Sequence, residues 1–232
     1  MRKGEESRKR IIETAEKLFN RRGYTNTSVQ DILDALNISK GGFYHYFDTK
    51  MDLLTEVCRR RTEEWYSHGV EYVRALRTGP VEKLNAALKL MNMLDMEAPA
   101  MLGLLTELGT QGQDAVPRRE FREITMQLLA PLVEEIIFSG IGEGEFTVRR
   151  PVETARIITL LALDINEESA RTIAQDYKNP ECTLEVLEML SAYRESIEQL
   201  VNAPYGSIDL FDVGDMVSAV RRVVDSMENA GR

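Results

Sequence analysis

The sequence contains few of the residues that interrupt helices, with 7 prolines and 15 glycines among 232 residues. It also has only two cysteines, Cys58 and Cys182, which stand alone and far apart. We therefore expect no disulfide framework and no Cys-x-x-Cys metal site, and a reducing cytoplasm fits this pattern. The scarcity of breakers predicts long uninterrupted segments of secondary structure.

Recognisable catalytic patterns are also missing. The two histidines, His45 and His68, form no His-x-x-x-His pair, and the chain has neither a phosphate-binding loop nor a Gly-x-Ser-x-Gly elbow. Adjacent carboxylates such as Glu134 and Glu135 diverge around a helix axis and do not converge on one substrate. We expect no enzymatic activity, no metal and no cofactor.

Long apolar runs are absent as well. The longest stretch, near residue 160, is interrupted by Thr159 and Asp164 and is far shorter than the roughly 20 residues that a membrane span needs. The basic start of the chain runs into Glu5 and Glu6 rather than into an apolar core. We therefore expect no signal peptide and a cytoplasmic protein without a membrane partner.

The charge is unevenly distributed along the chain. The net charge is -9, yet residues 1–50 contain ten basic and seven acidic side chains, so this part carries +3 and the remainder -12. A basic N-terminal part on an acidic body is suited to a phosphate-binding module on a soluble carrier. Chance variation in charge gives the same pattern, so charge alone decides little.

Apolar residues recur at helical spacing throughout, and no strand-like alternation is present. We expect an all-α fold with an N-terminal three-helix helix-turn-helix domain at residues 1–50 and a larger helical effector and dimerisation domain at 51–232. Pro131 should kink one long helix, and Gly140, Gly142 and Gly144 should form the loop after it. The predicted helices cover 7–22, 29–36, 39–47, 50 to beyond 65, 81–95, 99–110, 118–139, 152–177, 181–202 and 212–229.

Two short helices near the N-terminus are joined by a tight turn. Thr27 and Ser28 each precede a polar residue by three positions, which predicts a capped start for the first. Asn37 tolerates the left-handed conformation of a sharp turn, and Ser39 caps the second helix. A pair of short helices joined in this way is typical of a helix-turn-helix, whose second helix enters the major groove of DNA.

The residues of this unit resemble the DNA-binding signature of the tetracycline-repressor (TetR) family. The resemblance covers roughly the first fifty residues and rests on Ser39-Lys40-Gly41, on Tyr44-x-Tyr46-Phe47 and on Lys50 three places later. Asn37 stands where the family usually has Gly, and Gly42 where it usually has Thr, Ser or Ala. The second departure removes a possible base contact.

The resemblance implies a DNA interface. It places Lys40, Gly41, Gly42, Tyr44 and His45 at the groove. It places Tyr44 near phosphates as well, together with Thr27, Ser28, Tyr46 and Lys50. One of the two tyrosines should also belong to the core, and Tyr46 is favoured. The implied protein is a ligand-responsive regulator, a repressor that binds double-stranded DNA.

Specific recognition of DNA predicts a homodimer, because one short recognition helix reads too few base pairs. The segment 152–177 is apolar nearly all round its centre and must be covered on two sides. We assign the interface to this helix and one of the last two. A dimer predicts a near-palindromic operator.

The body is larger than a dimer support requires, and the resemblance implies a small, largely apolar effector within it. The candidate contacts are Trp65, Tyr66, Met91, Met93, Met96, Met101, Phe121, Leu128 and Asp164. Two alternatives remain open at this point: the methionines are ordinary core and the body binds no effector, or the chain is a helical adaptor or an enzyme without DNA binding.

Overall fold

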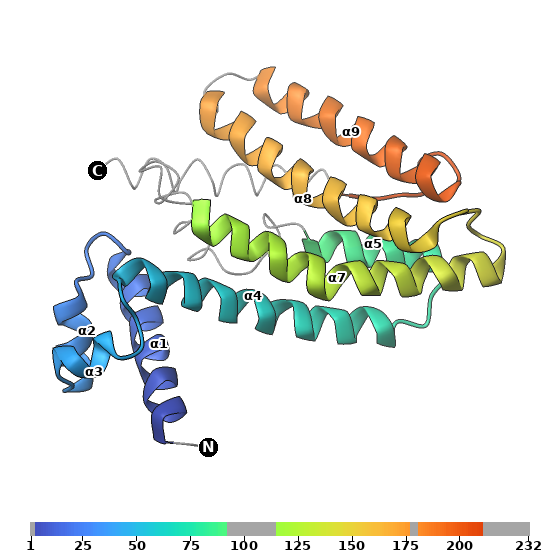
Figure 1. The fold of residues 1–232 in the computed structure, drawn as a ribbon. Helices are drawn as coiled ribbons and strands as arrows, with labels where there is room; N and C mark the ends of the chain where they lie inside the picture. The colour runs from blue at the N-terminus through green and yellow to red at the C-terminus, as the bar shows by residue number, and fades with distance from the viewer. Residues whose placement is uncertain (1–2, 92–114, 177–180, 211–232) are drawn as a thin grey trace.

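The computed structural model describes residues 3–91, 115–176 and 181–210, and within these ranges it contains helices and no strands (Figure 1). The fold is all-α, as predicted. The predicted helices at 99–110 and 212–229, together with Met93, Met96 and Met101, lie outside the described residues. The described helices are α1 (Lys3–Arg22), α2 (Val29–Leu36), α3 (Lys40–Tyr44), α4 (Lys50–Ala75), α5 (Pro80–Met91), α7 (Ala115–Glu143), α8 (Pro151–Asp176) and α9 (Glu181–Val201).

The N-terminal part, which we call the head (residues 3–58), is built from α1, α2, α3 and the start of α4. Its apolar side chains form a separate core, in which Ile32, Phe43 and Leu53 have no exposed surface. The amphipathic stripe of α1 supplies Ile11 and Ala15 to the same core. The head is thus held together by residues from four helices rather than by the helix-turn-helix alone.

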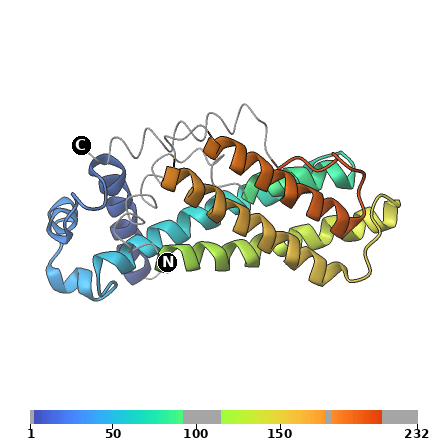
Figure 2. The same ribbon diagram turned by 90° about the horizontal axis from the view of Figure 1, so that it is seen from above.

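The remaining helices form a bundle, which we call the body (residues 62–210). In the body α7 packs against α4, α5 and α8, and α9 packs on α8. Figure 2 shows α8 and α9 lying side by side along one face of the bundle. Tyr66, Met91, Leu129 and Ile137 are fully buried between the helices. This core is distinct from that of the head.

The helix α4 belongs to both parts. Its first turns supply Leu53, Leu54, Val57 and Cys58 to the core of the head. Its second half supplies residues from Tyr66 onward to the core of the body. The predicted domain boundary after residue 50 coincides with the start of α4, but the core of the head continues to Cys58.

The loop predicted at the three glycines begins later than expected. Helix α7 continues through Gly140 and Gly142 to Glu143, and Gly144 ends it with φ +79°. A Cβ atom at Gly140 would lie 2.1 Å from the ring of Phe146. Gly140 is therefore a helical residue whose missing side chain makes room for Phe146, and the expectation that it lies in a loop was wrong.

Helix α7 also runs through Pro131, which is exposed. The segment Arg118–Glu143 is long and apolar enough to cross a membrane by length and composition, but half of its most apolar stretch is buried inside the bundle. A core helix of a helical bundle has the same apolar composition. The burial of α7 in the body accounts for its composition.

Candidate nucleic-acid interface

The turn between α2 and α3 depends on a left-handed residue, as the sequence predicts. Asn37 has φ 53° and ψ 49°. Its N–H donates to the carbonyl of Asp34 at 3.3 Å, and the N–H of Ile38 donates to that of Leu33 at 3.1 Å. These bonds satisfy carbonyl groups at the end of α2. Asparagine replaces the usual glycine here because it tolerates this conformation.

Helix α3 is fixed by its cap and by one buried face. The Ser39 side chain accepts a hydrogen bond from the N–H of Gly42 at 3.2 Å. Phe43 is fully buried, and its ring lies 5.9 Å from that of Phe47. These contacts anchor the inner face of a helix of five residues, which is too short to be stable by itself.

The other faces of α3 are open to solvent. Lys40, Gly41 and His45 are exposed, and Tyr44 has 51% of its surface exposed. Tyr46 is half-buried against the core of the head, which agrees with the preference for Tyr46 over Tyr44 as a core residue. The structure therefore brings Lys40, Tyr44 and His45 together on an exposed unit that a groove of DNA can reach.

Thr27 and Ser28 have different roles, although the sequence predicts a cap from either. Ser28 is the N-cap of α2, and its hydroxyl accepts from the N–H of Asp31 at 3.1 Å. Hydrogen bonds from Ser28 lower the pKa of the Asp31 carboxyl. Thr27 is fully buried, and its hydroxyl donates to the carbonyl of Gly23 at 2.8 Å. Its hydroxyl is therefore committed inside the head, whereas Ser28 is exposed.

Lys50 is tied to the loop before α2. Its Nζ donates to the carbonyl of Tyr24 at 2.7 Å and to that of Thr27 at 2.8 Å. The same ammonium group lies 3.9 Å from the centre of the Tyr24 ring. The resemblance places Lys50 near phosphates, but in this structure its charge fastens α4 to residues 24–27. Nothing in the spacing of the sequence predicts these carbonyl contacts.

A network of ion pairs joins α1 to α4, and sequence reasoning missed it. Arg8 pairs with Glu56 at 3.0 Å, Arg60 pairs with Glu13 at 3.5 Å, and Arg61 pairs with Glu16. Burial raises the pKa of Glu56, but hydrogen bonds from Arg59 and Arg8 outweigh it and leave the pKa below its usual value. Alternating charges four residues apart on both helices are the signal that could have suggested these pairs.

Comparison with known proteins connects this geometry to a family. The sequence profile of bacterial regulatory proteins of the tetR family matches residues 11–57, from α1 to the first turns of α4. Residues 11–57 of this chain thus match the helix-turn-helix part of the TetR family. The match coincides almost fully with the head and includes the helix-turn-helix.

Two relatives are similar to longer stretches of the chain. An uncharacterized HTH-type transcriptional regulator of Lactococcus lactis is 32% identical over 82 residues, which are 35% of this chain and 42% of that protein. The HTH-type transcriptional repressor KstR2 of Rhodococcus jostii is 26% identical over 185 residues, which are 73% of this chain and 86% of the repressor. The chain thus spans about two fifths of the first relative and most of the second.

Solved structures share the fold over most of their length. A TetR-family transcriptional regulator from Pectobacterium atrosepticum has a TM-score of 0.60 at 20% identity, covering 87% of this chain and 97% of that one. The transcriptional regulator FadR from Bacillus subtilis, solved in complex with stearoyl-CoA, has a TM-score of 0.52 at 19% identity, covering 85% and 99%. At such identities the likeness concerns the fold.

In the body, several of the predicted effector contacts lie together. Tyr66 and Met91 are fully buried, with Trp65 and Leu128 half-buried against the same core. The rings of Tyr66 and Phe121 lie 6.0 Å apart. A hydrogen bond of 3.1 Å joins the Tyr66 hydroxyl to that of Thr125, while burial raises the pKa of Tyr66. The body therefore contains an apolar cluster with two hydroxyl groups inside it.

Asp164 does not join this cluster. It is exposed on α8, and its carboxylate accepts a hydrogen bond from the hydroxyl of Tyr193 on α9. Burial of Tyr193 and the bond to Asp164 raise the pKa of that tyrosine to about 12. The helical repeat predicted Asp164 on the same helix as apolar residues, but did not predict that it faces away from them. Among the described residues, no acidic, histidine and cysteine side chains are grouped as a metal site would require.

Proposed function

We propose that this protein is a dimeric, ligand-responsive repressor of transcription that binds a near-palindromic DNA operator in the cytoplasm. The observation that carries the proposal is helix α3, which is anchored by Phe43 and presents Lys40, Tyr44 and His45 to solvent. A recognition helix needs this combination of a fixed inner face and free outer side chains.

Each exposed residue is assigned a role by its chemistry. Lys40 and His45 carry hydrogen-bond donors that can read base edges in the major groove. Gly41 lets the backbone approach DNA closely. Tyr44 and Ser28 have exposed hydroxyl groups suited to phosphate oxygens. Thr27, Tyr46 and Lys50 contribute by holding the head in shape, and Lys50 adds positive charge near the phosphates.

The dimer is assigned to α8 and α9. Ile157 and Leu160 on α8 are 43% and 36% exposed, and Leu184 on α9 is 60% exposed. Because the two helices lie side by side along one face of the bundle, a second copy can cover both at once (Figure 2). Stable interfaces of this kind bury about 800 Å² on each partner, which two helices can supply.

The effector is assigned to the apolar cluster around Tyr66, Met91 and Phe121. The FadR structure holds stearoyl-CoA, whose long acyl chain is apolar, and so supports an effector with an apolar part in a fold of this kind. Helix α4 connects the cluster to the head, so a change in its tilt alters the distance between the two recognition helices. The effector releases the protein from DNA if it prefers the tilted state, and coupling of about 1–3 kcal/mol is usual.

The test is operator binding. Genomic fragments are selected on the full-length protein, and binding of a selected fragment is measured by fluorescence anisotropy against a scrambled fragment of equal length. We expect a preference of at least about a thousandfold and a near-palindromic consensus. Equal binding of both fragments, or none, would favour the helical adaptor or the enzyme. A library of apolar metabolites is then screened for thermal stabilisation and for loss of operator binding.

A further inference from the structure

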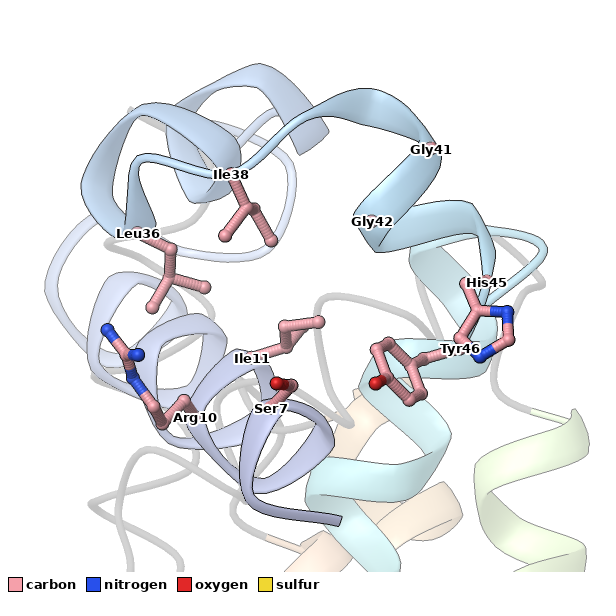
Figure 3. Close-up of a pocket in the computed structure, with 9 residues that line it drawn as sticks. All are labelled: Ser7, Arg10, Ile11, Leu36, Ile38, Gly41, Gly42, His45 and Tyr46. Carbon is pink, nitrogen blue, oxygen red and sulfur yellow. The ribbon is translucent and has the colours of Figure 1, made fainter. Parts of the chain in front are cut away.

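The head contains a cavity of about 410 Å³ between α1 and the α2–α3 unit (Figure 3). Ser7, Arg10 and Ile11 of α1 form one wall, and Gly41, Gly42 and His45 lie on the opposite side. This volume is within the range of sites that hold small organic molecules. The cavity lies far along the chain from the apolar cluster in the body that we assign to the effector.

The cavity is bounded by a glycine that the local fold does not require. Gly42 has no positive φ. A Cβ atom at Gly42 would meet Ser39 Oγ at 3.6 Å and Ile38 Cβ at 3.9 Å, which are ordinary contacts. An alanine could therefore occupy this position, and glycine weakens a helix relative to alanine. The bare backbone at Gly42 leaves open the space that a side chain would otherwise enter.

The lining combines an apolar surface with a few polar groups. Ile11 is almost fully buried, and Leu36 and Ile38 pack against the same core at the edge of the cavity. Figure 3 shows the hydroxyl of Tyr46 pointing across the cavity toward Ser7 and Ile11. A mostly apolar pocket with a small number of placed polar groups is the usual form of a small-molecule site.

Arg10 supplies the charge. Its neighbours on α1 are paired, Arg8 with Glu56 and Lys9 with Glu13. In residues 3–91, 115–176 and 181–210, by contrast, no carboxylate lies within ion-pair distance of Arg10. An unpaired guanidinium at the edge of an apolar cavity is suited to a carboxylate, which it can bind through two parallel hydrogen bonds.

We propose that this cavity binds a small organic monocarboxylate whose apolar part packs on Ile11, Leu36 and Ile38 and whose carboxylate pairs with Arg10. The effect of this ligand on operator binding rests on the proposed function. Because His45 and Gly41 line the same cavity and belong to the proposed DNA-facing unit, an occupant and the operator compete for the head. The head then responds to a ligand independently of the body.

The experiment uses phenylpropionate as the probe and phenylpropionamide, which has the same shape without the charge, as the control ligand. Binding to the full-length protein is measured by calorimetry, and operator binding by anisotropy with and without the probe. We expect phenylpropionate to bind at least about tenfold more tightly than the amide, the effect of one charge-assisted contact. We also expect it to weaken operator binding.

Three variants locate the site. Arg10→Gln should weaken phenylpropionate about tenfold, and Gly42→Leu should abolish its binding by filling the cavity. The control is Lys17→Gln, which removes another α1 cation that does not line the cavity. Circular dichroism tests whether each variant is folded. If Gly42→Leu is unfolded, the comparison of Arg10→Gln with Lys17→Gln tests the site by itself.

Absence of phenylpropionate binding at millimolar concentration would overturn the proposal. So would equal binding of the amide, or equal effects of Arg10→Gln and Lys17→Gln. Operator binding by the wild-type protein without the probe tests the proposed function separately, because it does not depend on the cavity. A protein that binds its operator but not the probe disproves this inference alone.

Discussion

At the scale of single residues, Lys50 shows how a charge near a DNA interface can act through the fold. Its ammonium group donates to two main-chain carbonyl groups and lies over the Tyr24 ring. These contacts fix the loop that leads into α2 and therefore the position of the helix-turn-helix. Any loss of DNA binding in a Lys50 variant combines lost charge with a displaced recognition unit.

Replacing Lys50 by Ala should therefore lower stability as well as affinity. We expect the free energy of unfolding to fall by about 1–3 kcal/mol, because two partly buried carbonyl groups lose a charged donor. Urea unfolding followed by circular dichroism measures this. Lys17→Ala is the matched control, since it removes an exposed cation from α1. Equal stability of the two variants would refute the fastening role of Lys50, whatever happens to operator binding.

His45 differs from Lys50, because it is exposed and its ring lies 4.8 Å from that of Tyr46 at the surface of the head. His45→Ala should leave the unfolding free energy within about 0.5 kcal/mol of the wild type. It should cost roughly 1–3 kcal/mol of binding at the operator and reduce the preference for the base it contacts. Anisotropy titrations with single-base operator variants measure both. A uniform loss for every variant would show that His45 contacts the backbone and not a base.

The residues that sequence reasoning placed correctly are those whose local geometry decides their role. Asn37 and Ser39 occupy a turn and a cap, and local hydrogen bonding dictates both positions. The contacts of Thr27 and Asp164 were not predicted, for the opposite reason. Their surroundings come from distant segments, the end of α1 for Thr27 and helix α9 for Asp164. Spacing along one helix does not contain that information.

At the scale of helices, Gly42 and Gly140 differ in the space that each leaves for a side chain. A Cβ atom at Gly42 meets only ordinary contacts, whereas one at Gly140 would collide with the Phe146 ring. Gly42→Ala should therefore stabilise the protein by up to about 1 kcal/mol through helix propensity. Gly140→Ala should destabilise it by about 1–3 kcal/mol through overpacking. The urea midpoints of the two variants measure these stability changes. Shifts of the same sign would contradict the difference in space between the two glycines.

The ion pairs between α1 and α4 make the stability of the folded protein depend on pH, with a sign that follows from Glu56. The pKa of Glu56 is lowered in the folded protein, so the ionised carboxylate stabilises the fold above the unfolded value of 4.5. That contribution is lost as the pH falls through the lower folded pKa. We expect Glu56→Gln to be about 1 kcal/mol less stable than the wild type at pH 7, a modest value because Arg8 and Arg59 are partly exposed.

The two proteins should converge in stability when the pH is lowered well below 4.5. Urea unfolding at a series of pH values measures the difference. Glu64→Gln is the control, because Glu64 pairs within α4 and with no residue of α1. A difference that stays constant into the acid range would show that Glu56 acts by packing and not by charge.

The end of helix α7 was not predicted correctly from the sequence. The periodicity of α7 and its glycines predicted a stop at residue 140, but Phe146 folds back onto Gly140 and the helix continues to Glu143. Packing between residues on either side of the loop decides the boundary. The starts of the short helices of the head were predicted within about a residue, because each has a capping side chain of its own, but α3 ends at Tyr44 and not at residue 47.

At the scale of the whole molecule, the exposed apolar residues of α8 and α9 predict the oligomeric state. Ile157→Glu should convert the dimer to a monomer, because the charge would be buried without a partner. Operator affinity should then fall at least about tenfold, since each monomer holds one half-site. Phe138→Glu is the control, because Phe138 is at least as exposed as Ile157 but lies on α7. Sedimentation velocity at micromolar concentration and anisotropy measure the two effects, and a monomeric wild type would refute the assignment.

Since α4 supplies side chains to both cores, the two parts of the molecule cannot unfold independently of it. The head loses Leu53, Leu54 and Val57 from its core whenever the first turns of α4 unwind. Helix α4 continues without a break between the two cores, and the Thr62 hydroxyl donates a hydrogen bond to the carbonyl of Cys58, where the core of the head ends. Amide protons of α1 and α2 should therefore exchange with solvent deuterium at rates that depend on mutations in the body. The rate at which the head opens to solvent thus depends on a helix that the head shares with the bundle.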